Sequence, residues 1–391
     1  MRNRRVLISG ASVAGPTLAF WLSRFGFEVT VVESAPGIRP GGYAVDFRGT
    51  GMRVLERMGL IDEVKALQTR TGSITMVNER GEVVARLPDG FTSGELEIMR
   101  GDLSKLLYEA TRDTAEYAFA DSIASLRQTT DAVEVTLRGG RSQAFDLVFG
   151  ADGLHSNVRA MVFGEESKFV RHMGYYIAIF TVPDFLQLHD TGRYYVQLGK
   201  RVGCFGNSNH GNAQASFYFA SAQMDYDRHD VAAQKQLLRE TFADVKWEAR
   251  RMLEMMAAAP DFYFDSLSQV KMDDWSSGRV ALIGDAASCA SPMAGMGTSI
   301  AMVGAFVLAS ELKAADGDYA TAFSNYQSRM RGFVIEAQKM ADSVGWFIPR
   351  TRLKLWLSGK LWSWMPQATL RELMIEQPAK VANLVVLKDH E

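Results

Sequence analysis

The chain has 391 residues, of which 47% are hydrophobic and 23% are charged, so disorder is excluded and one large or two ordinary globular cores are predicted. Its 43 basic and 45 acidic residues give a formal net charge of -2, which provides no global attraction to nucleic acid; any charged partner must be met by a local surface. The two cysteines, Cys204 and Cys289, lie outside any CxxC pattern, so neither a disulfide framework nor a thiolate metal site is expected, and a cytoplasmic location fits.

The N-terminal segments predict a βαβ unit. Residues 6–9 form a short apolar run typical of a buried strand, residues 14–25 have helical spacing, and residues 27–33 form a second, β-branched run. Farther along, two alternating runs within residues 73–87 flank Glu79, Arg80 and Gly81, which predicts a hairpin. Asp102 is a candidate N-cap for a helix that continues to about residue 112.

The residue composition of the chain changes after residue 170. Residues 175–182 and 215–220 are aromatic, β-rich runs, and residues 231–242 have helical spacing. Residues 279–283 then form another buried-strand run, so the chain is expected to return to its first sheet. We therefore predict a first domain at 1–170 and 270–317 with the hairpin inserted near 73–87, a second domain at 171–269, and C-terminal helices at 318–391.

A glycine-rich turn follows the first predicted strand. In the Gly-Ala-Ser-Val-Ala-Gly run at 10–15, helix-terminal N–H groups can face a pyrophosphate, and an acidic residue ending the next strand can hold a ribose. Ser12 replaces the usual middle glycine, which weakens the match because the backbone approaches phosphate closely there. The sequence predicts a dinucleotide site built from Gly10, Ser12, Val13, Ala14, Gly15 and Glu33.

Two later motifs indicate which dinucleotide is bound. A DG segment at 150–159 and a GD segment at 284–297 each follow a predicted strand. In this order after the glycine fingerprint, the three motifs resemble the single-component aromatic-hydroxylase family of FAD-dependent monooxygenases, over roughly the first 340 residues. The resemblance implies an α/β fold with a Rossmann-type FAD-binding domain, an inserted β-sheet substrate domain and a C-terminal helical segment.

The resemblance also assigns FAD contacts. Asp285 resembles the family aspartate that accepts hydrogen bonds from the flavin ribityl chain. Pro292, Gly295 and Gly297 resemble the residues that run along the isoalloxazine ring and open the following helix, whose N-terminus would stabilise anionic reduced flavin. Arg100, in the Met-Arg-Gly-Asp run, resembles a family arginine near the FAD.

Further positions match the family less closely. Asp46 and Arg48, after a Gly-Gly pair, resemble the loop between flavin and substrate, and Asp152 matches the DG aspartate that serves both FAD and NAD(P)H. Arg39 is a candidate contact for a nicotinamide phosphate. The chain departs from the family where members often have His, Gln and Asn, and these positions are Ser288, Met296 and Ser299.

The same resemblance implies a reaction cycle. The sequence contains no second glycine fingerprint, so NADPH or NADH is expected to visit transiently and reduce non-covalently bound FAD. Molecular oxygen would then give a flavin C4a-hydroperoxide that delivers one oxygen atom to an electron-rich carbon. Because the flavin carries the chemistry, we expect no catalytic protein nucleophile or base. A monomer without a bound metal is expected.

A large planar or polycyclic substrate is the expected ligand of the second domain. Narrower features resemble the tetracycline destructases: the Gly-Gly loop followed by Asp-Phe-Arg-Gly at 46–49, the strand-like residues 262–265 and the helical tail. A hydroxylase of another aromatic or polyketide compound stays open, as does a non-catalytic flavin-binding or drug-sequestering protein. Aromatic side chains are the substrate candidates, with ordinary core packing as their alternative: Tyr176, Phe180, Tyr195, Phe217 and Phe219.

The tail is rich in tryptophan and basic residues. Residues 346–364 hold four of the seven tryptophans, four basic residues and no acid, and Leu353, Leu357, Leu361 and Trp364 fall on one helical face. Three interpretations stay open. The tail could be a helix packed on both domains, a basic amphipathic helix on a membrane surface, or a substrate gate, which is what the resemblance to some tetracycline destructases implies at this position. No membrane span is expected, since no run of about 18 apolar residues occurs.

Overall fold

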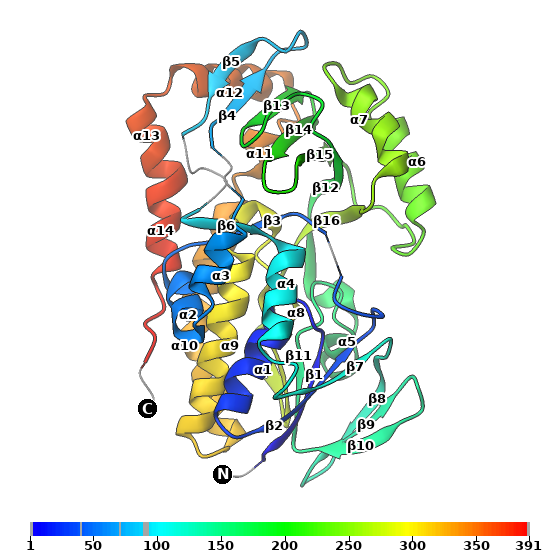
Figure 1. Cartoon of the computed structure of the whole chain (residues 1–391), viewed down its shortest axis with the longest axis vertical. Helices are drawn as coiled ribbons and strands as arrows, with labels where there is room; N and C mark the ends of the chain where they lie inside the picture. Colours follow the sequence, from blue (N-terminus) through cyan, green and yellow to red (C-terminus); the bar gives the residue numbers. More distant parts are fainter. Residues whose placement is uncertain (1–2, 40, 70–71, 89–93, 389–391) are drawn as a thin grey trace.

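Figure 1 shows the computed structural model, which describes residues 3–39, 41–69, 72–88 and 94–388. A six-stranded sheet forms the lower half, in the order β17-β18-β11-β1-β2-β7, with β17 antiparallel and the rest parallel. The strands are β1 (Arg5–Ser9), β2 (Glu28–Glu33), β7 (Glu116–Phe119), β11 (Leu147–Gly150), β17 (Ser276–Ser277) and β18 (Val280–Leu282). Four of the five β1 residues are buried, as expected of a parallel strand covered on both faces.

Helices cover this sheet, and α9 (Gly297–Ala314) lies against α1 (Ala14–Arg24) and α10 (Tyr319–Ala341). By length and composition alone α9 could cross a membrane, but 78% of it is buried inside the protein, which is the environment of a core helix. The shorter helices of this half are α2 (Thr50–Met58), α3 (Ile61–Ala66), α4 (Arg100–Glu109), α5 (Asn157–Phe163) and α8 (Asp285–Ser288). A three-stranded antiparallel sheet lies beside them, with β8 (Ile123–Gln128), β9 (Val133–Leu137) and β10 (Ser142–Phe145).

A seven-stranded sheet forms the upper half, in the order β16-β12-β15-β14-β13-β4-β5. All neighbours are antiparallel except β13 and β4, which run parallel. One face of this sheet packs on α6 (Val231–Thr241) and α7 (Ala249–Met255). Its strands are β4 (Ile74–Val77), β5 (Val83–Arg86), β12 (Val170–Pro183), β13 (Gly192–Gln197), β14 (Lys200–Asn207), β15 (Asn212–Ala220) and β16 (Tyr263–Val270).

The tail connects the two halves. It comprises α11 (Val344–Phe347), α12 (Arg352–Trp364), α13 (Gln367–Arg371) and α14 (Gln377–Ala382). Helix α12 lies near the top of Figure 1 beside β5, and α13 and α14 lead down one edge. Below them, the Thr50 hydroxyl donates to the Val385 carbonyl at 3.0 Å, which attaches the chain end to α2. A two-stranded sheet of β3 (Ala44–Phe47) and β6 (Leu96–Met99) lies between the halves.

Most predicted elements are present. The βαβ unit is confirmed, and the hairpin is β4 and β5, although its strands extend the upper sheet through the β4 and β13 pair. The prediction that Asp102 caps a helix is wrong: α4 begins at Arg100 and ends at Glu109, so Asp102 lies within the first turn. The division into domains stays a prediction.

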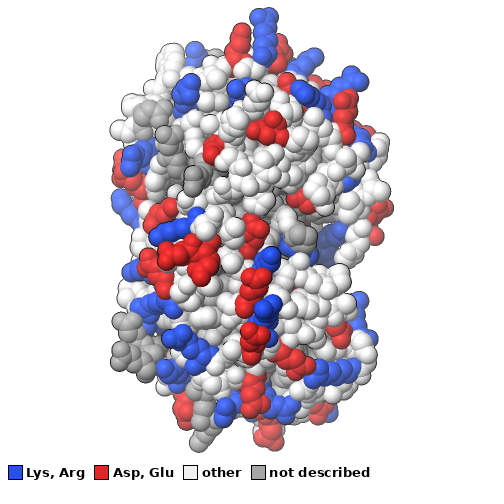
Figure 2. Space-filling model, viewed as in Figure 1, with Lys and Arg blue, Asp and Glu red and all other residues white. Residues whose placement is uncertain are grey.

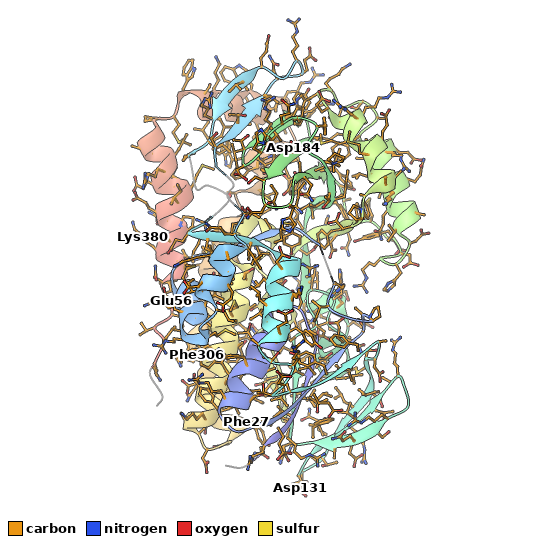
Figure 3. The ribbon with its side chains drawn as sticks, viewed as in Figure 1. Phe27, Glu56, Asp131, Asp184, Phe306 and Lys380 are labelled. Atoms are coloured by element: carbon orange, nitrogen blue, oxygen red, sulfur yellow. The ribbon has the colours of Figure 1, made fainter. Side chains whose placement is uncertain are left out.

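The orientation of the halves is visible from single residues. Figure 3 places Asp184, which follows β12, in the upper half, and Asp131, in the turn between β8 and β9, at the lower end. Phe27 and Phe306 lie in the lower core, each 4% exposed. Figure 2 shows Lys and Arg interspersed with Asp and Glu over this face, in keeping with the small net charge.

Candidate functional site

The turn between β1 and α1 is held by close backbone packing. Gly10 has φ +109°, and a Cβ there would lie 2.5 Å from the Ala151 carbonyl oxygen on the neighbouring segment after β11. A Cβ on Gly15 would lie 1.9 Å from the Gly10 carbonyl oxygen. Both positions therefore require glycine. Ser12, which stands where the usual pattern has a middle glycine, lines the cavity described below.

Glu33 is held by backbone donors from this turn and from the segment that follows β2. The Ala11 N–H donates to its carboxylate at 2.8 Å and the Ala35 N–H at 2.9 Å, and the side chain lies at the end of β2 with 6% exposure. Glu33 also lines the cavity, as does Arg39 nearby. A buried carboxylate held this way can still accept from ligand hydroxyl groups with its remaining lone pairs.

The GD segment lies across the cavity from this turn. Asp285 begins α8 after β18, and burial raises the pKa of its carboxyl, although a hydrogen bond with Cys289 and the charge of Arg100 act in the opposite sense. Gly295 has φ +59°, a conformation that favours glycine, and Gly297 opens α9. Since α9 has no side-chain N-cap, its first N–H groups form a positive end toward the cavity.

Two arginines complete this end of the cavity. Arg48 donates from Nε to Asp46 at 2.9 Å, and burial raises the pKa of that carboxyl while the arginine lowers it. Arg100 has its Nη1 3.5 Å from the Ser12 hydroxyl, and its Nε is buried without a hydrogen-bond partner. The loop before β3 is anchored to the upper sheet, because the Gln214 amide donates to the Gly42 carbonyl at 2.6 Å.

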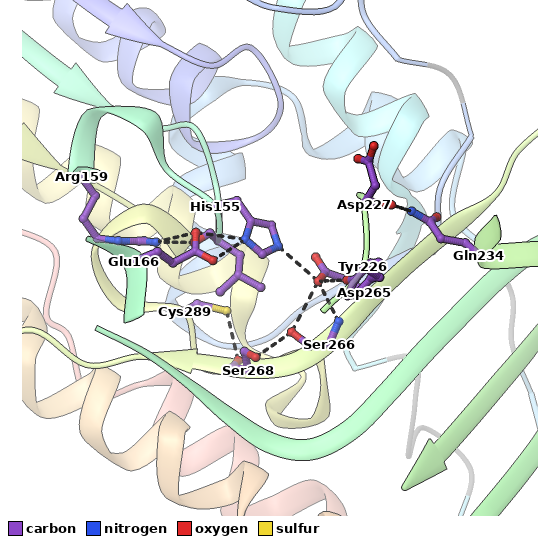
Figure 4. Close-up of polar contacts among 11 residues, drawn as sticks. His155, Arg159, Glu166, Tyr226, Asp227, Gln234, Asp265, Ser266, Ser268 and Cys289 are labelled. Carbon is purple, nitrogen blue, oxygen red and sulfur yellow. Dashed lines mark hydrogen bonds and ion pairs between the residues drawn. The ribbon is translucent and has the colours of Figure 1, made fainter. Parts of the chain in front are cut away.

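The DG segment forms a polar network with the upper sheet (Figure 4). Asp152 accepts from the Ser156 hydroxyl at 2.5 Å and the Val158 N–H at 3.0 Å, which closes the turn before α5; burial raises its pKa. His155 lies with Nδ1 2.9 Å from Glu166 and Nε2 3.2 Å from Asp265 of β16.

Paired carboxylates control the charge of His155. Burial lowers its pKa, but hydrogen bonds to Asp265 and Glu166, together with their charges, raise it to about 9. Burial likewise raises the pKa of Glu166, yet the hydrogen bond and charge of His155 bring it below its ordinary value. The loop therefore carries an ionised pair at neutral pH, attached to the edge of the upper sheet.

One cavity of about 1710 Å³ connects these groups with the upper sheet. It is larger than the usual ligand site of about 300–1,000 Å³, so it can hold a dinucleotide and a second ligand together. Every predicted cofactor contact except Gly15 lines it, while Gly15 packs behind Gly10. The lining contacts are Gly10, Ser12, Val13, Ala14, Glu33, Asp46, Arg48, Arg100, Asp152, Asp285, Pro292, Gly295 and Gly297.

The five aromatic substrate candidates require a correction. They lie on the opposite face of the upper sheet, within the apolar core beneath α6 and α7 and away from the cavity. Successive strand residues point to opposite faces, so the residues between them face the cavity instead. The candidates that do not line the cavity are Tyr176, Phe180, Tyr195, Phe217 and Phe219. The cavity face carries Ile177, Ile179, Tyr194, Arg201, Phe205, Asn207, Gln214, Ser216 and Tyr218.

Three buried polar side chains on the cavity face have an atom without a partner. Arg201 is 5% exposed, its guanidinium carbon lies 3.4 Å from the Tyr194 ring centroid, and its Nε has no hydrogen-bond partner. Asn207 Oδ1 and Ser216 Oγ, at 5% and 3% residue exposure, also lack partners. Such groups are costly to bury unless a ligand pairs with them. Because they line the cavity, they are candidates for a polar ligand subsite.

The tail forms another wall of the cavity. Leu361, Trp362 and Met365 line it, and the Trp362 ring lies 5.3 Å from that of Phe347. The packed interpretation fits this side of α12. Of the apolar face named from the sequence, Leu361 lines the cavity, but Leu353, at 68%, and Trp364, at 76%, are exposed.

Sequence reasoning missed the polar subsite and the His155 network. Period-two alternation was the available signal, since Arg201, Gly203, Phe205 and Asn207 occupy every second position of β14. The alternation defines two faces but does not say which one meets a ligand. No local pattern could have joined His155 to a partner 110 positions away.

The residues present fit a flavin dinucleotide. The unpaired Arg100 Nε and the uncapped start of α9 form a set of donors suited to a pyrophosphate and an electron-rich ring. Glu33 and Asp285 are acceptors suited to hydroxyl groups. The functional roles of the individual residues stay predictions.

Comparison with known proteins gives concordant matches. A family model described as an FAD binding domain matches residues 3–322. An uncharacterized protein of Mycobacterium tuberculosis is 44% identical over 337 residues, covering 85% of this chain and 91% of the relative. A flavin-dependent monooxygenase of Legionella longbeachae is 40% identical over 342 residues, covering 86% and 88% of the two chains.

Solved structures resemble the whole chain. The tetracycline destructase Tet(51) superimposes with a TM-score of 0.85 at 34% identity, covering 100% of both chains. Tet(55) superimposes with a TM-score of 0.83 at 35% identity, again over 100% of both. The fold alone is shared with Klebsiella pneumoniae HpxO in complex with FAD and uric acid, at 21% identity, 97% coverage of both chains and a TM-score of 0.76.

Proposed function

The chain belongs to the FAD-binding family of flavin-dependent monooxygenases, and we propose that it uses NADPH or NADH to hydroxylate and inactivate a polycyclic substrate of the tetracycline class. The likeness to two tetracycline destructases over the full chain supports this substrate class. So does a cavity of about 1710 Å³, which has room for a flavin and a second large ring system.

The observation that carries the proposal is the position of the polar subsite. Arg201, Asn207 and Ser216 line the same cavity as the flavin-binding end of the molecule. A bound flavin supplies the reduction of oxygen and the transfer of one oxygen atom. The chain's own residues then orient the substrate and limit its contact with water, since the tail and the upper sheet both form walls of the cavity.

Arg201 would hold an anionic oxygen of the substrate. Its guanidinium lies over the Tyr194 ring, the residue lines the cavity, and its Nε has no hydrogen-bond partner. No ion pair joins it to a carboxylate among the described residues, so its positive charge is available to the ligand. Enolate and phenolate oxygens on fused rings are suitable acceptors, because a planar fork pairs well with planar, charge-delocalised groups.

The direct test measures turnover. Protein loaded with FAD is mixed with NADPH or NADH, with and without tetracycline, and nicotinamide oxidation and oxygen uptake are followed while mass spectrometry monitors the antibiotic. We expect tetracycline to stimulate oxidation and to gain oxygen or give an oxygenated breakdown product. Oxidation of another aromatic or polyketide with tetracycline unchanged would favour the alternative hydroxylase. Flavin and drug binding without stimulated oxidation would favour a sequestering protein.

Arg201 provides a sharper test of substrate recognition. In Arg201→Met we expect KM for an acidic polycyclic substrate to rise roughly 10- to 100-fold, the range for a lost charged hydrogen bond, while FAD absorbance is retained. Arg193→Met is the matched control, because Arg193 pairs with Cys204 across β13 and β14 and does not line the cavity. An unchanged KM in Arg201→Met would remove this arginine from the substrate site.

A further inference from the structure

Helix α12 has apolar side chains on two opposite sides. On the inner side, Trp362 is 8% exposed and lines the cavity. On the outer side, Leu353 is 68%, Trp356 60%, Leu357 40% and Trp364 76% exposed. A helix at the surface ordinarily carries one apolar stripe, directed at the core, so the outer stripe has no role in the fold.

The outer stripe has a regular arrangement. At about 100° per residue, its four members fall within roughly 100° of the helix circumference, with Lys360 among them. Arg352 and Lys354 lie on the two flanks of the stripe. Lys360 Nζ lies 4.7 Å from the Trp364 ring centroid and Lys354 Nζ 5.0 Å from that of Trp346, which is itself 40% exposed.

The charge along this part of the chain has one sign. Between Asp342 and Glu372 the sequence contains no acidic residue, and the basic residues of this interval are Arg350, Arg352, Lys354, Lys360 and Arg371. This contrasts with the net charge of -2 of the whole chain. A surface that complements the stripe and its basic residues is therefore apolar within and negatively charged at its boundary.

We propose that the outer face of α12 lies on the surface of an anionic lipid bilayer. The leucines would enter the boundary between head groups and acyl chains, and the tryptophans would lie at the interface, where their amphipathic rings are favoured. The basic side chains would extend to the lipid phosphates. A second copy of the chain fits less well, because two such faces would bring like charges together.

This contact would place the cavity next to the lipid surface. Leu361, Trp362 and Met365 form the cavity wall on the inner side of the region whose outer side meets the bilayer. A substrate with a large apolar ring system partitions into the same interface. Lipid binding itself does not depend on the proposed function and is measured without turnover.

The test uses the full FAD-loaded chain and sedimentation with vesicles. Phosphatidylcholine vesicles are compared with vesicles that also contain phosphatidylglycerol, at low and high salt. We expect binding to the anionic vesicles only, weakened by salt, with a blue shift of tryptophan emission as the indoles leave water. Equal binding to both kinds of vesicle, or binding to neither, would overturn the proposal.

Paired variants assign the binding to this face. We expect Trp356→Ser with Trp364→Ser, and separately Lys354→Glu with Lys360→Glu, to lower vesicle partitioning at least about tenfold. Leu384→Ser, at an exposed position, and Arg112→Glu, on a distant surface, are the controls and should bind like the unaltered chain. Retained flavin absorbance and thermal midpoint confirm folding.

Two results would contradict the assignment. If both double variants partition like the unaltered chain, the stripe is not the lipid contact. If light scattering shows a dimer that Trp356→Ser with Trp364→Ser converts to a monomer, and vesicles do not bind, the occupant is a second copy of the chain.

Discussion

The two faces of the seven-stranded sheet come from the same strands but differ in how fully their side chains are paired and packed. Beneath α6 and α7, Phe180 and Phe217 stack with centroids 5.6 Å apart, and Phe217 meets Phe242 edge to face at 4.9 Å. On the cavity face, Arg201 and Ser216 each have a buried polar atom without a partner. One face is saturated with contacts, and the other has unfilled bonding capacity.

The difference separates stability from recognition. Aromatic side chains bury large areas, so a strand rich in them is driven toward a covering helix. A ligand face must instead retain polar groups that the protein does not satisfy, which is a cost in the absence of ligand. Substitutions on the two faces should therefore have opposite signatures in stability and binding.

The largest effect is expected on the sheet face that lies beneath α6 and α7. Phe217→Ala should lower the free energy of unfolding by about 3–5 kcal/mol, because Phe217 is 0% exposed and its removal leaves a cavity under α6. Urea denaturation measures the loss. At the next position, which lies on the cavity face, Tyr218→Phe should change the free energy of unfolding by less than about 1 kcal/mol. Similar losses at both positions would contradict the division between the faces.

A smaller loss of stability is expected at a crowded position of the cavity face. In Gly203→Ala the new Cβ would lie 2.5 Å from the Tyr194 ring and 2.7 Å from the Ser216 hydroxyl. Overpacking of this kind costs about 1–3 kcal/mol and would displace Tyr194 from Arg201. Thermal unfolding and substrate KM should both worsen. Gly332→Ala, in an open position of α10, should instead be neutral or stabilising, since alanine favours the helix.

Removing the buried charge should reverse the sign of the stability change. Arg201→Met replaces a guanidinium that has no carboxylate partner among the described residues by an apolar chain of similar length. Burying a charge without an ionic partner is costly, so its replacement by an apolar chain relieves that cost. We expect an equal or higher midpoint in urea together with weaker substrate binding. A midpoint lowered as far as in Phe217→Ala would mean that Arg201 serves the fold.

The smallest effect concerns the pH dependence of stability at the edge of the cavity face. The pKa of His155 is raised to about 9 in the folded chain, against about 6.5 when unfolded. Its contribution to stability is therefore fully present below about pH 6.5 and is lost as the pH rises through about 9. His155→Gln should flatten this part of the pH profile of the urea midpoint. An unchanged slope in the variant would show that the His155 pair with Asp265 and Glu166 does not connect the DG loop to the sheet.

Local signals predicted much of the lower half. The turn at Gly10, the strand ending in Glu33 and the GD segment are each defined by residues close in sequence, and the structure brings them to one cavity. The unpaired state of Arg201 and the partners of His155 were not accessible in this way. The contact of His155 with Asp265 joins segments 110 residues apart, and the unpaired state of Arg201 depends on everything that packs around it, neither of which a short pattern encodes.

By itself, the sequence determined the βαβ unit, the order of the three motifs and the two alternating faces of the upper strands, because these follow from periodicity and turn chemistry over a few residues. Only the tertiary structure decided which alternating face α6 and α7 cover, because alternation is symmetric until a covering element is placed. It also decided that the hairpin extends the upper sheet, since Ile74 pairs with Gly192. The ligand face was therefore determined by what packs on its back.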